Sequence, residues 1–251
     1  MLGTVGLLVL AVFTVGLCYL AITHDEDTPV TAEESSGSNA GGGAAGSESA
    51  SADPNAPPEI ADQVRADFTA SPDLPPGART YDNPATGGPL QVNEAGLSHA
   101  PPKAPIAIGS LEVQLAAPVR KLGATIGFPE GNAGSVGLIA WTSSLVDART
   151  ADQPVPTSGL RLVVTPSDWE LTVYDGGEFV IGGDDYEPVD GPVTFEVYRS
   201  ENTVWVVDPA GTVTRTEDPL VGELAGPWAC WQLIEDNPQQ TPARIQALWA
   251  G

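Results

Sequence analysis

The sequence predicts an all-β fold, an antiparallel two-sheet sandwich, preceded by one transmembrane helix and a disordered linker. Three observations predict this organisation. Residues 1–22 are apolar and uncharged, and residues 23–58 are rich in Ser, Gly, Ala, Pro and acids. Residues 59–251 contain short apolar runs separated by Gly, Pro and Asp at intervals of about ten residues, a spacing typical of sandwiches and barrels.

Residues 1–22 would reach roughly 33 Å as a helix, enough to span a hydrocarbon core of about 30 Å. The run is longer than the apolar part of a usual signal peptide and has no small-residue cleavage site, so an anchor is favoured over a cleaved signal. The first basic side chain of the sequence is Arg65. Because no Lys or Arg flanks the helix, we expect a single-pass protein of the cell membrane with its C-terminal domain outside the cytoplasm.

Residues 23–58 contain almost no large apolar side chain, so they cannot bury enough surface to offset the entropy of ordering. They are predicted to be a disordered linker, either a plain spacer or a glycosylated stalk. The chain has 10 basic and 33 acidic residues, a net charge of −23. Since phosphate contacts need a basic surface, this charge argues against a nucleic-acid partner.

Strands are expected wherever apolar residues alternate with polar ones. In the segment 169–174, Trp169, Leu171 and Val173 share one face, and the segment 193–199 repeats the pattern. The predicted strands are 111–115, 119–128, 135–142, 160–164, 168–174, 178–182, 192–199, 203–208, 212–215 and 228–235. The segment 243–249 alternates as a strand does, although Thr241-Pro242 could also start a helix.

Two hairpins are predicted from their turn residues. Asp175-Gly176-Gly177-Glu178 offers small residues for the positive φ angles of a tight turn. Asp208-Pro209-Ala210-Gly211 places Pro second and Gly fourth, as a type I turn followed by a bulge prefers. The strands that flank each turn are therefore expected to run antiparallel.

The sequence resembles the concanavalin A-like lectin/glucanase jelly roll, including laminin-G-like domains, over about residues 60–251. The segments that carry the resemblance are Asp67-Phe68, Leu74-Pro75-Pro76-Gly77, 122–128, 169–174 with its Asp-Gly-Gly turn, 195–214 and 228–234. The resemblance implies saccharide binding on a concave sheet, in some members with calcium at a rim loop. A subset of this family hydrolyses glycosides, but its Glu-x-Asp-x-x-Glu signature is absent here.

Alternation predicts a polar sheet face that could bind a ligand. Tyr rings stack on sugars, and carboxylate and guanidinium groups hydrogen-bond to hydroxyls. The candidate ligand-binding residues are Arg161, Glu170, Tyr174, Glu196 and Tyr198. An ordinary solvated sheet face is the competing interpretation.

Glu170 and Glu196 are also the weak candidates for a catalytic acid and base, because glycoside hydrolysis uses two carboxylates at a fixed separation. No nucleophile or base arrangement accompanies them, so the sequence favours a protein that is not an enzyme. Asp184, Asp185 and Asp190 lie in the acidic segment 182–191, which could hold calcium but lacks EF-hand spacing. We therefore expect no cofactor, with calcium as the open alternative.

These inferences predict a membrane-anchored, extracytoplasmic sandwich that binds a cell-envelope or extracellular polysaccharide or glycoprotein without catalysis. The alternatives are an envelope glycoside hydrolase and a protein-interaction module of a membrane complex. The negative charge favours a neutral or cationic ligand. Cys230 has no partner in the C-terminal domain, because Cys18 lies in the apolar segment, so it is expected to be a small buried apolar residue.

Overall fold

The computed structural model describes residues 53, 55–82, 89–100, 106–132, 134–150, 158–224, 226–235 and 241–251. The predicted transmembrane helix, residues 1–22, and residues 23–52 of the predicted linker lie outside this set. Among the described residues, none belongs to a helix with the length and hydropathy needed to cross a bilayer.

The described part of the chain forms fifteen strands and two short helices. The strands are β1 (Val64–Asp67), β2 (Arg79–Asp82), β3 (Leu90–Asn93), β4 (Gly96–His99), β5 (Ala107–Gln114), β6 (Lys121–Gly127), β7 (Ser135–Trp141), β8 (Ser158–Val164), β9 (Asp168–Asp175), β10 (Glu178–Asp185), β11 (Val193–Ser200), β12 (Thr203–Val207), β13 (Val213–Glu217), β14 (Trp228–Glu235) and β15 (Arg244–Ala250). The helices are α1 (Leu145–Thr150) and α2 (Pro219–Glu223).

The strands form two antiparallel sheets. Sheet A has eight strands in the order β13-β12-β11-β6-β15-β4-β3, with β1 paired to β15 outside this path. Sheet B has seven strands in the order β10-β9-β8-β7-β14-β5-β2. The predicted all-β, antiparallel two-sheet sandwich is therefore confirmed.

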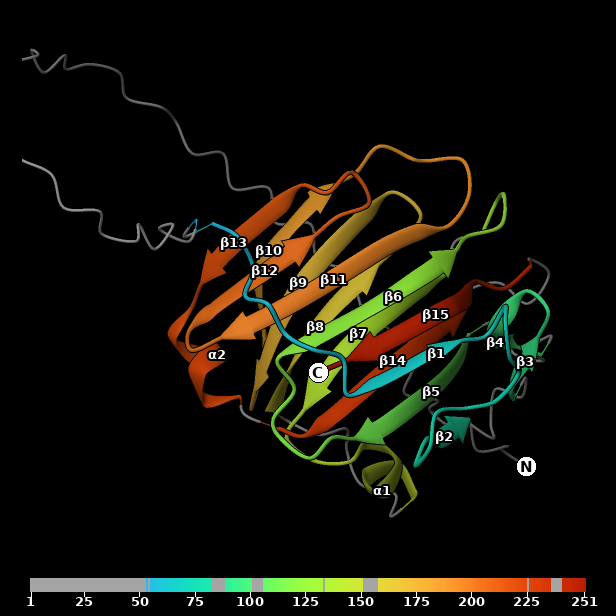
Figure 1. The fold of residues 1–251 in the computed structure, drawn as a ribbon, viewed down its shortest axis with the longest axis horizontal. Coiled ribbons are helices and arrows are strands. Elements are labelled where there is room, and N and C mark those ends of the chain that lie inside the picture. Colours follow the sequence, from blue (N-terminus) through green and yellow to red (C-terminus); the bar gives the residue numbers. More distant parts are fainter. Residues whose placement is uncertain are drawn as a thin grey trace, which may run out of the picture. The chain divides into compact units, whose positions relative to one another are not determined.

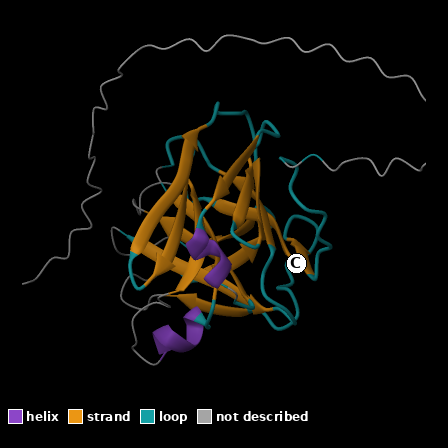
Figure 2. Cartoon of the chain, turned by 90° about the vertical axis from the view of Figure 1, so that its left-hand side faces the viewer, coloured by secondary structure: helices purple, strands orange, loops and turns teal. Residues whose placement is uncertain are grey.

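The two sheets pack face to face (Figures 1 and 2). Sheet A is the nearer layer in Figure 1, and the two helices, purple in Figure 2, lie outside the strand layers. Helix α2 contacts β12 of sheet A and β9 of sheet B, whereas α1 contacts β2 and β5 of sheet B. The helices therefore cover the margins of the sandwich and contribute little to its layers.

The core lies between the sheets and follows the period-two pattern of the sequence. On β9, Trp169, Leu171 and Val173 face the core, and on β11 Phe195 and Val197 do so. The residues between them point away from the core on each strand, because successive side chains of a strand alternate. Each sheet therefore has an inner apolar face and an outer face, and the outer faces carry the candidate site residues.

All of the predicted strands are present, including residues 243–249, which form strand β15 rather than a helix. Strand β10 extends to Asp185, beyond the predicted end at residue 182. Four strands of four residues each, β1 to β4, were not predicted. They precede residue 100, where Pro and Gly interrupt the alternation that identifies longer strands.

Both predicted hairpins are present. Gly176 has a φ of 64° between β9 and β10, and Gly211 has a φ of 81° between β12 and β13. The Asp208 carboxylate accepts hydrogen bonds from the backbone N–H groups of Ala210 and Thr212, at 2.9 and 2.8 Å. These turns fix the register of the two sheet edges, because a hairpin turn sets which residues face each other.

Candidate functional site

Three of the predicted binding residues lie on the outer face of sheet B. The Arg161 guanidinium on β8 lies 5.1 Å from the ring centre of Tyr174 on β9. Glu178 on β10 stands opposite Tyr174 in the register. Its carboxylate accepts a hydrogen bond from the Tyr174 hydroxyl at 2.7 Å and one from Arg161 at 3.0 Å. Burial and this hydrogen bond raise the pKa of Tyr174.

Glu170, the third predicted residue on this face, is exposed and lies on β9. The Thr172 hydroxyl donates to its carboxylate at 3.3 Å. Beside them the Trp141 and Tyr174 rings are 5.5 Å apart between centres. Trp141 also packs with Ile139, so this part of the outer face is partly apolar.

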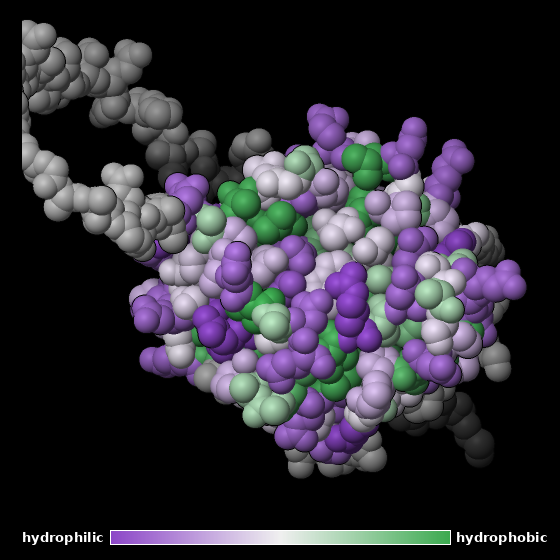
Figure 3. Space-filling view, in the orientation of Figure 1, coloured by the Kyte–Doolittle hydropathy of each residue, from purple (hydrophilic) through white to green (hydrophobic). Residues whose placement is uncertain are grey.

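Glu196 and Tyr198 lie on β11, on the outer face of sheet A. The Glu196 carboxylate accepts hydrogen bonds from the Tyr198 hydroxyl and from Nε1 of Trp249, both at 2.8 Å. The Lys121 ammonium lies 3.6 Å from the same carboxylate. Burial and the hydrogen bond to Glu196 raise the pKa of Tyr198. Figure 3, drawn in the orientation of Figure 1, shows that this side of the domain is mostly hydrophilic with separate apolar patches.

The structure does not bring the five predicted binding residues onto one surface. Arg161, Glu170 and Tyr174 face outward from sheet B, whereas Glu196 and Tyr198 face outward from sheet A, with the core between them. Glu170 and Glu196 therefore cannot flank one glycosidic bond, which a catalytic acid and base must do.

The acidic segment does not form one loop. Asp184 and Asp185 are exposed residues of β10, whereas Asp190 lies in the connection to β11. Tyr186 separates them, because it is buried and its hydroxyl donates to the backbone oxygen of Thr165 at 2.5 Å. Within the described residues, no three His, Cys, Asp or Glu side chains are grouped as metal ligands.

A pocket lies at one end of sheet A, where β6 ends and where β11 and β15 begin. We call it the rim pocket. Its volume is about 580 Å³, within the range of small-molecule sites. It is lined by Gly127, Phe128, Pro129, Glu130, Pro188, Val189, Asp190, Gly191, Pro192, Arg244 and Gln246.

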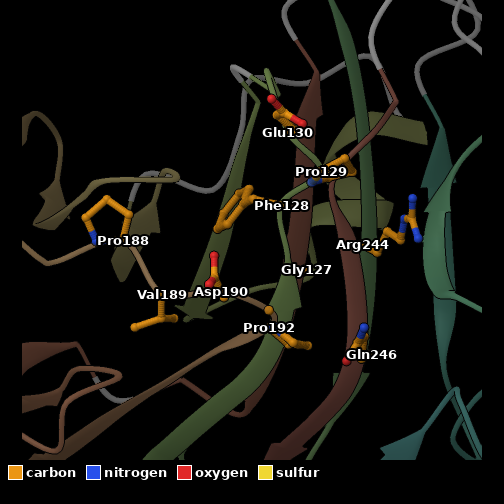
Figure 4. A pocket seen from close by; sticks show the side chains of 11 residues that line it. Gly127, Phe128, Pro129, Glu130, Pro188, Val189, Asp190, Pro192, Arg244 and Gln246 are labelled. Carbon is orange, nitrogen blue, oxygen red and sulfur yellow. The ribbon is translucent and has the colours of Figure 1, made fainter.

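The rim pocket combines an apolar wall with polar groups. Figure 4 shows Phe128 pointing from the end of β6 toward the connection between β10 and β11, and Asp190 pointing from that connection toward Phe128. Gln246 and Arg244 come from β15, with Arg244 extending on the side away from Phe128. No hydrogen bond or ion pair joins the side chains of Asp190, Arg244 and Gln246 to the described part of the chain.

The rim pocket differs from the two sheet faces in the hydrogen bonds that its polar side chains already make. On sheet B, the Glu178 carboxylate already accepts hydrogen bonds from the Tyr174 hydroxyl and from Arg161. On sheet A, the Glu196 carboxylate accepts hydrogen bonds from the Tyr198 hydroxyl and from Nε1 of Trp249. A ligand at the Tyr174 or Tyr198 hydroxyl would have to replace an existing hydrogen bond. The buried Nε1 atoms of Trp141 and Trp205 on the sheet faces have no hydrogen-bond partner in the described part of the chain, but the rim pocket places its Asp190 and Gln246 side chains around a hollow. We therefore take the rim pocket as the candidate site.

Of the rim-pocket residues, the sequence singled out only Asp190. The pocket joins segments near residues 128, 190 and 245, which come together only when the strands are assigned to sheets. The sequence feature that could have pointed to the pocket is a pair of proline-containing segments, Phe128-Pro129 and Pro188–Pro192. Such segments form loops at strand ends, where binding residues are common.

Comparisons with known proteins identify the fold. No protein-family model and no curated protein matches the sequence. A solved protein of unknown function with a galectin-like fold from Bacillus subtilis is similar at 13% identity and a TM-score of 0.55, covering 78% of this chain and 97% of that one. The VIP36 exoplasmic/lumenal domain is similar at 10% identity and a TM-score of 0.52, covering 70% of this chain and 84% of that one. The described domain thus has the galectin- and concanavalin-like jelly-roll fold that the sequence resembles.

Cys230 is expected to be chemically inert in the folded protein. Its side chain is fully buried, and burial together with the nearby Glu112 carboxylate raises the pKa of its thiol. Since the thiolate is the reactive form, a thiol reagent should label Cys230 in a Cys18→Ser variant only after denaturant is added. Labelling of the native protein at the rate of the unfolded chain would contradict this expectation.

Proposed function

We propose that this domain binds a saccharide without catalysis and that the rim pocket is the binding site. The observation that carries the proposal is the hollow in which the Phe128 ring faces Asp190, with Gln246 of β15 also in the lining. An aromatic ring stacks on the apolar face of a sugar, while amide and carboxylate groups hydrogen-bond to its hydroxyls. Asp190 and Gln246 supply these polar groups.

The fold supports this proposal in a general way. The VIP36 domain was solved in a form described as bound to Ca²⁺ and Man₃GlcNAc, so saccharide binding is one use of this architecture. A fold hosts many functions, and the function resides in the site. The rim pocket therefore carries more weight in the proposal than the neighbour does.

The charge of the chain indicates which saccharides to expect. With a net charge of −23, the protein repels polyanions at long range. Among the described residues that line the rim pocket, Arg244 is basic, and Asp190 and Glu130 are acidic. We propose a neutral or cationic polysaccharide, or the glycan of a glycoprotein, as the ligand.

The location of the domain is part of the proposal. Residues 1–22 would anchor the chain in the cell membrane, and residues 23–58 would hold the domain outside the cytoplasm. A protease added to intact cells should then remove the C-terminal domain while cytoplasmic proteins survive. Protection of the domain until the membrane is permeabilised would contradict this topology.

Replacing Phe128 with alanine is expected to weaken saccharide binding about tenfold or more, because a lost ring-to-sugar contact costs about 1.4 kcal/mol or more. The full chain would be screened on a glycan array, and binding of the best saccharide would be measured by calorimetry. Gln246→Ala should weaken binding by a similar factor through lost hydrogen bonds.

Phe179→Ala provides the matched control, because Phe179 is an exposed phenylalanine on β10 outside the rim pocket. It should leave the affinity unchanged. Equal affinities for Phe128→Ala and the unmodified protein would refute the rim pocket as the site. Absence of any glycan signal would instead favour a protein-interaction module.

A further inference from the structure

The sequence contains two Asp-Gly pairs, Asp175-Gly176 and Asp190-Gly191. In such a pair the backbone nitrogen of the glycine can attack Cγ of the aspartate, because glycine has no Cβ that hinders the approach. The attack requires the aspartate to rotate about its backbone and side-chain bonds, so it is slow where hydrogen bonds hold that backbone in one conformation. The structure therefore determines which of the two pairs can react.

Asp175-Gly176 lies in a hydrogen-bonded hairpin turn. Asp175 is the last residue of β9 and pairs with Ser158 of β8. Its N–H donates to the Gly177 oxygen at 3.1 Å, and the next residues on both sides of the turn pair in the β9–β10 ladder. Rotation of Asp175 would break these contacts, so we expect this pair to react slowly.

Asp190-Gly191 lies in the connection from β10 to β11, where the backbone is held less firmly. Residues 187–192 are all exposed. Within the described part of the chain, none of these six residues makes a backbone–backbone hydrogen bond. Gly191 has a φ of 109°, and a Cβ at this position would meet no atom within 4 Å. The attacking nitrogen is therefore unpaired and has open space around it.

The Asp190 side chain is equally available. Among the described residues, no hydrogen bond or ion pair holds its carboxylate. Figure 4 shows this carboxylate pointing toward the ring of Phe128, inside the rim pocket. A reaction between Asp190 and Gly191 would therefore change the chemistry of the candidate site itself.

We propose that Asp190-Gly191 is a modification site at which the backbone isomerises to isoaspartate. In the first step the Gly191 nitrogen forms a bond to Cγ of the protonated Asp190 carboxyl group. The bond from Cγ to its hydroxyl oxygen breaks, and the hydroxyl leaves as water with the amide proton. The product of this step is a cyclic succinimide.

In the second step water adds to the main-chain carbonyl carbon of Asp190. The bond from that carbon to the Gly191 nitrogen breaks, and the nitrogen recovers a proton from the water. The main chain then continues through Cβ and Cγ, and the former main-chain carbonyl becomes the free carboxylate. One water is lost and one is gained, so the mass is unchanged and water is the only co-reactant.

The effect of this isomerisation on binding rests on the proposed function. The main chain gains one carbon at Asp190, and the carboxylate is then attached directly to Cα. The carboxylate thus leaves its position opposite Phe128, and the rim pocket should bind saccharide less tightly. The modification would couple the age of the protein to its affinity for a glycan.

Incubation of the full chain at neutral pH for several weeks tests the chemistry. Trypsin then releases residues 162–199 as one peptide, because Arg161 and Arg199 are the basic residues that bound it. This peptide contains both Asp-Gly pairs, so electron-transfer fragmentation compares them in one sample. Since local opening governs the rate, we expect about tenfold or more isoaspartate at Asp190 than at Asp175.

The affinity for the best saccharide of the glycan array would be measured before and after incubation. The incubated protein should bind several-fold more weakly than the fresh protein. Asp190→Glu keeps a carboxylate whose longer arm cyclises poorly, so its affinity should not fall relative to its own fresh sample. Asp175→Glu is the matched control and should lose affinity on incubation as the unmodified protein does.

Equal amounts of isoaspartate at the two positions, or none at Asp190, would overturn the modification site. Undiminished affinity of a protein that carries isoaspartate at this position would overturn its effect on the rim pocket. If the fresh protein binds no saccharide, the proposed function fails, while the peptide map still decides whether Asp190 isomerises.

Discussion

Replacing Trp231 with alanine is expected to lower the free energy of unfolding by about 3–5 kcal/mol. Trp231 is the largest fully buried side chain among the described residues, with 1% of its surface exposed. It lies on β14, which is flanked by β7 and β5 near the middle of sheet B. Its Nε1 donates to the backbone oxygen of Gly123 at 3.1 Å, on β6 of the opposite sheet. The substitution would therefore open a cavity and remove a hydrogen bond between the sheets.

Urea unfolding followed by circular dichroism would measure this loss, with Trp231→Phe as the conservative variant. Phenylalanine keeps most of the buried volume and loses the hydrogen bond, so a smaller cost, of about 1–2 kcal/mol, is expected. Phe179→Ala removes an aromatic ring that is 48% exposed, and should stay within about 0.5 kcal/mol. A Trp231→Ala protein as stable as Phe179→Ala would place Trp231 outside the core and contradict the sheet packing.

Period-two patterning was sufficient to predict most of the sandwich. The apolar residues of segments 169–174 and 193–199 face the core as expected. The turn residues around Gly176 and Gly211 identified which strands pair as hairpins. Alternation fails for strands such as β2, which has only four residues, because so short a run barely differs from a loop.

Alternation also determines which residues of a strand share a face, but it does not determine which sheet the strand joins. Tyr174 and Glu196 both point outward, as the pattern predicted, yet β9 belongs to sheet B and β11 to sheet A. The chain changes sheet between β10 and β11, at the acidic connection that includes Asp190. A sequence pattern cannot detect that crossing, so it grouped residues from opposite faces.

Contacts between residues of one hairpin are easier to predict from the sequence. A tight turn at Gly176-Gly177 places Glu178 opposite Tyr174, so the ion pair partner of Arg161 could have been identified from turn geometry. The rim pocket could not, since Phe128, Asp190 and Gln246 come from three distant segments of the sequence. Their proximity depends on the strand order β11-β6-β15 in sheet A.

Glu112 is a fully buried carboxylate whose contacts are all satisfied. It lies on β5 with none of its surface exposed. Its oxygens accept hydrogen bonds from the Ser144 hydroxyl at 2.6 Å and from the N–H groups of Leu145 and Val146 at 2.8 and 3.2 Å. The Arg79 guanidinium lies 3.7 Å away. Glu112 thus holds the first turn of α1, whose N–H groups have no partner within the helix.

Glu112→Ala is expected to cost about 3 kcal/mol or more of the free energy of unfolding, because it removes the acceptor of the Ser144 hydroxyl and of the Leu145 and Val146 N–H groups. Arg79 keeps its ion pair with Asp147. Hydrogen exchange at Leu145 and Val146 should accelerate before the sheets open, since α1 would detach first. Glu112→Gln retains one oxygen for the two backbone N–H groups, and its amide can donate to the Ser144 hydroxyl. The glutamine variant should therefore lose only about 1 kcal/mol. Equal losses for the two variants would mean that side-chain charge, rather than satisfaction of the helix N-terminus, is what Glu112 contributes.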